Sequence, residues 1–189
     1  MTTPQSSSII IRKATPSDAQ AIADVGTHVF TVTQGPHMPP TDLSAYLSQT
    51  FSLSATASCL QNPLKETYVA IDRSATTITT TSSSSILGFA LACRKTSDPC
   101  IAEVHEPIHL QRIYVYPHAQ GQGVGKLLVQ SIETEARNQG FENLWLKVYE
   151  GNHRAIAVYQ KLGFKQVGTH DFVTKTAGVW TDLVMVKSL

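Results

Sequence analysis

The chain has 189 residues, enough for one globular domain with a sizeable core, and 42% of them are hydrophobic. The formal net charge is only +1, without a basic run, so neither nucleic acid nor a membrane surface is an expected partner. Cys59, Cys93 and Cys100 form no CxxC pair, and neither they nor the histidines have metal-ligand spacing, which predicts a reduced protein without a metal site. No signal peptide or apolar run of membrane-spanning length is present, so we expect a cytoplasmic protein.

The first half of the chain predicts an opening strand, two or three helices and two more strands. Pro16 and Asp18 supply helix-start chemistry, and Thr41 or Asp42 can cap the second helix. The stretch 74–85 is almost wholly Ser and Thr, too polar to pack, and predicts a long mobile hairpin loop. The expected elements are a flexible N-terminus over 1–8, strands over 9–12, 67–71 and 86–93, helices over 19–29, 42–47 and 53–60, and a second loop over 96–107.

The second half predicts alternating strands and helices. Apolar residues recur at helical spacing over 123–139, and Gly140 is a fitting stop. Asn152 can cap the next helix, which Gly163 ends. The expected strands cover 108–116, 144–149, 164–169 and 179–187. The element order predicts an α/β (α+β) domain around a mixed sheet.

The loop 120–126 (QGQGVGK) joins a predicted strand to a predicted helix. Its three alternating glycines expose bare backbone, and the unpaired amides at the helix start carry the positive end of the helix dipole. An anion fits there, and Lys126 adds a cation unless it lies on the solvated helix face. The loop therefore predicts a phosphate-bearing ligand, against the alternative of a glycine-rich turn with no ligand.

Two other phosphate-binding patterns fit this loop poorly. A nucleotide P-loop needs Ser or Thr after its lysine, whereas Leu127 follows Lys126. A dinucleotide fingerprint needs a third glycine at position 126 and more following chain than this sequence has. Glu150, at the end of the next predicted strand, is the one feature that favours the dinucleotide interpretation.

Three linked motifs resemble the GNAT (GCN5-related) N-acetyltransferase superfamily. The segment 120–125 (QGQGVG) fits its Q/R-x-x-G-x-G/A signature, the strand 110–117 (LQRIYVYP) is similar to the strand before it, and 152–164 resembles N-x-x-A-x-x-x-Y-x-x-x-G-F. The resemblance implies a mixed, mostly antiparallel central sheet flanked by helices, with a splayed strand pair that holds coenzyme A. It also implies that residues 9–189 form a single acyl-CoA N-acyltransferase domain.

By this resemblance, acetyl-CoA is the co-substrate. The loop amides would hold its pyrophosphate, and the pantetheine arm would lie between strands 110–116 and 143–149. The coenzyme-contacting residues that the resemblance implies are Ile113, Tyr114, Val115, Gln120, Gly121, Gln122, Gly123, Val124, Gly125, Lys126, Asn152 and Tyr159.

The implied chemistry is direct attack of a neutral amine on the acyl thioester within a ternary complex. An amide near Val115 would polarise the thioester carbonyl, and Tyr159 would protonate the departing thiolate, unless it is a plain core tyrosine. Asn152 would contact the coenzyme arm, cap a helix, or do both. For the base, His109 stands where family members often place Glu; Glu106 or a water is the alternative.

The whole chain also looks like the bacterial polyamine (spermidine/spermine) N-acetyltransferases, through the runs 42–47, 111–115 and 181–185. This resemblance favours a small amine or polyamine as the acceptor, with Phe30, Tyr46 and His37 lining its site. The stretches 74–85 and 96–107 depart from that pattern. A protein lysine or N-terminal acetyltransferase and a non-catalytic acyl-CoA-binding module are the alternatives, and the protein is expected to be a monomer or a homodimer.

Overall fold

A computed structural model describes residues 9–73, 86–174 and 178–189, so the expected N-terminal segment 1–8 and the expected Ser/Thr-rich loop 74–85 lie outside the described residues. The described strands form one sheet in the order β1-β2-β3-β4-β5-β7-β6, in which only the β4–β5 pair is parallel. The strands are β1 (Ile9–Lys13), β2 (Lys65–Asp72), β3 (Ile86–Cys93), β4 (Pro107–Val115), β5 (Asn143–Tyr149), β6 (Lys165–Thr174) and β7 (Gly178–Ser188). The predicted mixed, mostly antiparallel sheet flanked by helices is confirmed.

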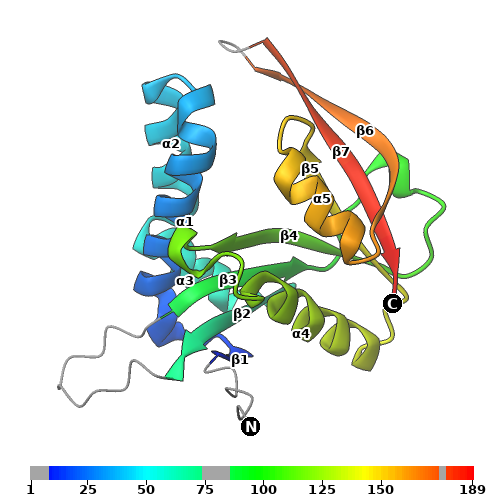
Figure 1. Ribbon diagram of the computed structural model, residues 1–189, viewed down its shortest axis with the longest axis horizontal. Helices are drawn as coiled ribbons and strands as arrows, with labels where there is room; N and C mark the ends of the chain where they lie inside the picture. The colour runs from blue at the N-terminus through cyan, green and yellow to red at the C-terminus, as the bar shows by residue number, and fades with distance from the viewer. Residues whose placement is uncertain (1–8, 74–85, 175–177) are drawn as a thin grey trace, which may run out of the picture.

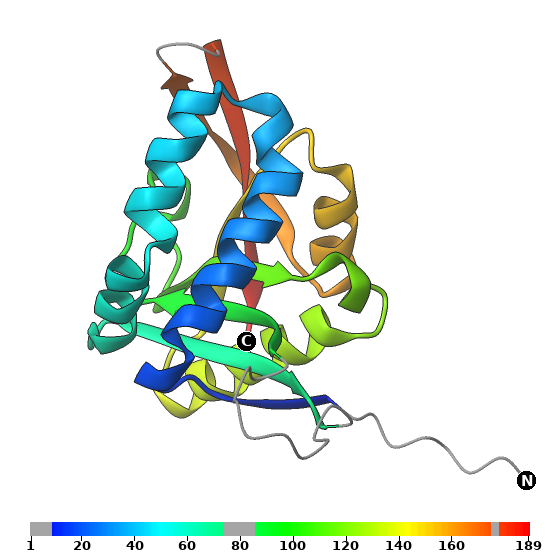
Figure 2. The same ribbon diagram turned by 90° about the vertical axis from the view of Figure 1, so that its left-hand side faces the viewer.

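Helices cover both faces of the first four strands (Figures 1 and 2). The helices are α1 (Ala19–Gln34), α2 (Pro40–Phe51), α3 (Leu53–Gln61), α4 (Val124–Asn138) and α5 (His153–Lys161). Phe89 and Leu91 of β3 pack in the cluster beneath α1, whereas Ala90 and Ala92 pack toward α4. Because successive side chains of a strand point to opposite faces, β3 is buried on both sides, as its unbroken apolar sequence predicts.

The sheet divides between β4 and β5. These strands pair only where Pro107–His109 meets Asn143–Trp145, and the rest of β4 pairs with β3 alone. Leu91 lies opposite Arg112 and Ala92 opposite Leu110, so Gln111 is an extra residue in β4, a bulge that bends the strand. In Figure 1, β6 and β7 rise away from β4. Among the described strands, none therefore pairs with the β5-facing edge of β4 beyond His109.

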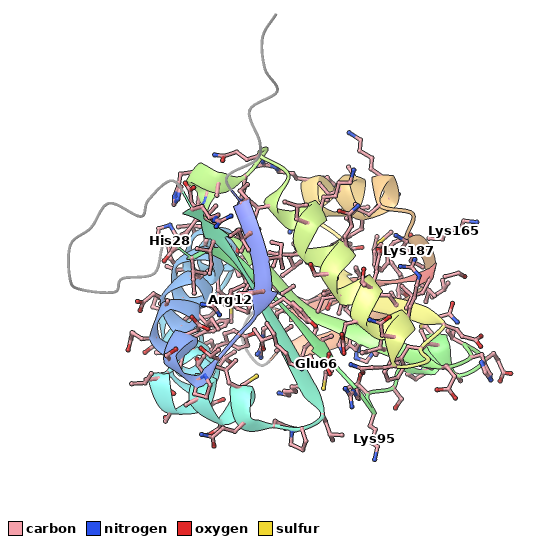
Figure 3. The ribbon with its side chains drawn as sticks, turned by 90° about the horizontal axis from the view of Figure 1, so that it is seen from below. Arg12, His28, Glu66, Lys95, Lys165 and Lys187 are labelled. Atoms are coloured by element: carbon pink, nitrogen blue, oxygen red, sulfur yellow. The ribbon has the colours of Figure 1, made fainter. Side chains whose placement is uncertain are left out.

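Helix α4 is tied to both halves of the divided sheet. Lys187 of β7 forms an ion pair with Glu133 of α4, and Gln139, just after α4, donates to Glu66 of β2 at 2.8 Å. Glu66 also pairs with Arg94. Seen from below, Glu66 and Lys187 lie on either side of α4 (Figure 3). These contacts hold the two halves in a fixed relation beneath the division.

Two local predictions need correction. Neither Thr41 nor Asp42 caps the second helix, because α2 begins at Pro40 and Pro39 is the cap. Proline suits a first helical turn, where its missing N–H costs no hydrogen bond. The stretch 96–107 is also more than a loop: it contains a short 3₁₀ helix, η4 (Pro99–Ile101), and Ile101 packs with Trp145 and Val184.

Candidate active site

The glycine-rich loop presents backbone amides at the start of α4. Gly121 has φ +82° and Gly123, the N-cap of α4, has φ +83°, a region that favours glycine. A Cβ added at either position meets no heavy atom within 4 Å, so open space lies in front of the loop. Gln120 Nε2 donates to the Val115 carbonyl at 3.0 Å and ties the loop to β4. The arrangement suits an anion held by amides at a helix start.

A cavity of about 530 Å³, here called the loop cavity, fills the division between β4 and β5. Its walls are β4 over 110–115, the loop with the first turn of α4, the end of β5, α5 and the last turns of α1. Every residue predicted to contact the coenzyme lines it except Gln122, whose side-chain amide donates to the His118 carbonyl at 2.9 Å. The prediction did not include Arg154, which also lines the cavity. The basic residues on its walls are Arg112, Lys126, Lys147 and Arg154.

Two side chains of the α5 motif line the loop cavity. Asn152 Oδ1 accepts the Ala155 amide at 3.1 Å, so this residue caps α5 while lining the cavity. The Tyr159 ring packs edge-on against Phe164, with 5.7 Å between centroids. Burial raises the pKa of Tyr159, which keeps its phenol protonated at neutral pH. Tyr159 is therefore in the form that an acid requires.

A second cavity of about 480 Å³, the aromatic cavity, adjoins the first. Phe30 stacks on Tyr46 with 4.2 Å between ring centroids, and Tyr149 stacks on Trp180 with 4.6 Å. Asp42 and Asp182 supply carboxylates to the same walls. The residues common to both cavities are Gln34, Tyr114, Lys147 and Tyr149. Phe30 and Tyr46 thus line the cavity, as the sequence predicts. His37 does not line it, although its ring centroid is 6.5 Å from that of Trp180.

His109 is not brought together with Tyr159. Its ring stacks on Trp145 with 3.8 Å between centroids and 9° between planes, and among the described residues it lines neither cavity. Burial lowers the pKa of His109 to about 4, so the imidazole is neutral at physiological pH. The residue is half-buried, between the buried Ile108 and Leu110 of β4.

A charged cluster that the sequence did not predict lies beside the aromatic cavity. Asp98, just before η4, has Oδ2 2.7 Å from Lys147 Nζ and 2.8 Å from His170 Nδ1. Burial acts to raise the pKa of Asp98, but the Lys147 ion pair and the Cys100 amide hold it at about 2. The pKa of Asp182, by contrast, is raised overall, because burial raises it and Lys147 and His170 offset only part of the rise. The one trace in the sequence is the polar alternation of Lys147 and Tyr149 along β5.

Comparison with known proteins agrees with this geometry. The Acetyltransferase (GNAT) family model matches residues 45–164. An uncharacterised N-acetyltransferase of Mycobacterium bovis is 25% identical over 173 residues, which cover 92% of this chain and 99% of that protein. The crystal structure of a PaiA N-acetyltransferase from Thermoplasma acidophilum in complex with coenzyme A has a TM-score of 0.71 at 19% identity, over 96% of this chain and 99% of that one.

A third likeness is to a ribosomal-protein-alanine N-acetyltransferase from Brucella melitensis, with a TM-score of 0.69 and 22% identity, covering 95% of this chain and 99% of that one. The divided sheet and the glycine loop define an acyl-CoA-dependent acetyltransferase, with acetyl-CoA as co-substrate. The chain belongs to the Acetyltransferase (GNAT) family.

Among the described residues, no helix is long and apolar enough to cross a membrane. Nor do three or more His, Cys, Asp or Glu side chains of the described ranges gather into a group that could hold a metal ion.

Proposed function

We propose that the protein transfers the acetyl group of acetyl-CoA to the primary amine of a small molecule, polyamines included. One observation carries the proposal: the loop cavity and the aromatic cavity meet at Tyr114, Lys147 and Tyr149. Two substrates held in adjoining cavities can react directly, because proximity replaces a bimolecular encounter. The amine then attacks the thioester within a ternary complex, and no covalent acyl-enzyme is required.

In this proposal the loop cavity binds the coenzyme. The amides of the glycine loop hold the pyrophosphate, and Lys126 and Arg154 add positive charge at the walls. The open edge of β4 offers backbone groups near Ile113 and Val115 to the pantetheine arm, as an added strand would use them. An amide near Val115 is placed to polarise the thioester carbonyl.

Tyr159 donates a proton to the departing thiolate. Its raised pKa makes the phenol a weaker acid, but the same apolar surroundings raise the basicity of a thiolate formed beside it. The difference in proton affinity between donor and acceptor therefore stays modest. His109 is left out of the proposed chemistry because its ring is stacked on Trp145 and lines neither cavity.

The aromatic cavity suits a cationic acceptor. Rings of Phe30, Tyr46, Tyr149 and Trp180 can contact the apolar part of an amine and attract its charge through their faces. The carboxylates of Asp42 and Asp182 complement one or more ammonium groups. This combination supports a small amine or polyamine rather than an anionic acceptor.

The test is thiol release from acetyl-CoA with a panel of polyamines, aryl-alkyl amines, amino acids and peptides with a free N-terminal alanine or an internal lysine. Turnover of free amines that falls at least 100-fold in Tyr159→Phe supports the proposal. Tyr116→Phe is the matched control, because Tyr116 lines neither cavity. Turnover with peptides alone would favour a protein acetyltransferase. Acetyl-CoA binding without turnover of any acceptor would favour a non-catalytic module.

A further inference from the structure

We infer that Asp182 is the group that binds the ammonium of the acceptor amine in the aromatic cavity and takes its first proton. The inference rests on the proposed function and adds the base that the sequence left open. Asp182 lines the aromatic cavity and is partly buried there. It lies directly opposite Tyr149 in the β5–β7 ladder, and Tyr149 lines both cavities.

The register of the sheet directs Asp182 toward the junction of the cavities. Paired residues of neighbouring strands lie on one face, so Asp182 shares its face with Tyr149 of β5 and His170 of β6. Lys147, two residues before Tyr149, is on this face as well and also lines both cavities. Asp182 therefore stands at the end of β5 where the divided strands admit the coenzyme arm.

The charges around Asp182 suit this role. Asp98 engages both Lys147 and His170 through one carboxylate oxygen, so neither cation is directed at Asp182 alone. Burial raises the pKa of Asp182, which makes its carboxylate a stronger base than an exposed one. Lys147 and the apolar walls also disfavour a second cation, so they promote loss of a proton from the bound ammonium. The charged and titratable groups around it are Lys147, Tyr149, His170, Asp98 and, across the cavity, Asp42.

The proton balance of the step closes. The ammonium gives one proton to the Asp182 carboxylate, which later releases it to solvent. The freed lone pair forms the N–C bond to the acyl carbon, the C–S bond breaks, and its electron pair stays on sulfur. The nitrogen then loses a second proton while the thiolate gains one from Tyr159, which is reprotonated. One of the three ammonium protons remains in the amide, one ends on the thiol and one in solvent.

The experiment compares Asp182→Asn and Asp182→Glu with the wild type, using the best amine from the panel. Asp171→Asn is the matched control, because Asp171 is exposed, pairs with Thr181 and faces away from the cavity. We expect Asp182→Asn to lower kcat/KM for the amine about 100-fold or more while acetyl-CoA binding is kept. The fall of kcat/KM toward acid pH should disappear in this variant, and Asp182→Glu should recover part of the activity.

The possible results separate the inference from the function on which it rests. Activity of Asp182→Asn within about threefold of the wild type overturns the inference, as does a raised KM with unchanged kcat and pH profile. If Asp182→Asn no longer binds acetyl-CoA, the Asp182→Glu variant decides. If its kcat/KM still falls toward acid pH, Asp182 acts as the base; if that fall is lost, the inference is overturned. Absence of turnover in the wild type with every acceptor contradicts the proposed function itself.

Discussion

Replacing Gly123 with alanine tests whether the loop amides hold the coenzyme. Gly123 has φ +83°, and a left-handed backbone costs an L-residue roughly 1–2 kcal/mol. A Cβ there meets no heavy atom within 4 Å, so no clash adds to the strain. Stability should therefore fall by only about 1–2 kcal/mol, which in a domain of this size lowers Tm by roughly 2–8 °C. The new methyl, however, projects into the space in front of the loop.

Gly140→Ala is the matched control at the other end of α4. Gly140 also has φ +83° and open space around an added Cβ, but it lines neither cavity. Both variants should show the same loss of Tm by differential scanning fluorimetry. By isothermal titration calorimetry, only Gly123→Ala should weaken acetyl-CoA binding, by tenfold or more, which corresponds to about 1.4 kcal/mol. Equal affinities for acetyl-CoA in the two variants would refute the assignment of the loop.

Three further predictions concern catalysis and stability. Tyr159→Phe should lower kcat at least 100-fold in the thiol-release assay. Because only the hydroxyl is lost, the KM for acetyl-CoA should stay within about threefold of the wild-type value and the unfolding free energy within about 0.5 kcal/mol. Hydrogen bonds from Arg12 lower the pKa of Asp18 from 3.8 to about 2. Because the Arg12 side chain is 37% exposed and water screens the pair, this shift contributes at most about 2 kcal/mol to the free energy of unfolding. A carboxyl pKa that is lower in the folded than in the unfolded state stabilises the fold above the unfolded pKa, and this stabilisation is lost as pH falls through the folded pKa. In urea titrations, the loss of unfolding free energy in Asp18→Asn should therefore be full at pH 7 and shrink between pH 4 and about 2. A loss that does not change with pH would contradict this. Gly26→Ala should destabilise the fold by about 1–3 kcal/mol, because the new Cβ would lie 2.3 Å from Phe51 Cδ1 in the α1–α2 contact. A Tm equal to that of the wild type would contradict this and show that α2 shifts without cost.

Local chemistry allowed the elements of the fold and the glycine loop to be predicted, whereas the other coenzyme-contacting residues were implied by the resemblance to the GNAT superfamily. The unbroken apolar run of β3, the cap at Asn152 and the stop at Gly140 depend on neighbouring residues, and the structure has each of them. The glycines of the loop predict bare backbone at a helix start, and the structure adds that Gly121 and Gly123 have positive φ angles, which favour glycine. The error at Thr41 and Asp42 was also local, because a proline in the first turn took precedence over a side-chain cap.

The aromatic cavity and the charges beside it depended on contacts between residues far apart in the chain. Asp98, Lys147, His170 and Asp182 come from a loop and three strands. The β5–β7–β6 register puts Lys147, His170 and Asp182 on one face of the sheet, where Asp98 contacts Lys147 and His170. A shift of one residue in that register would turn Asp182 to the other face. His109 shows the same dependence, since its register opposite Trp145 places its ring on that indole. The sequence by itself determined the element order and the glycine loop at the start of α4, because both follow from short-range backbone chemistry. The tertiary structure decided which charges gather beside the aromatic cavity, because strand pairing brings them together.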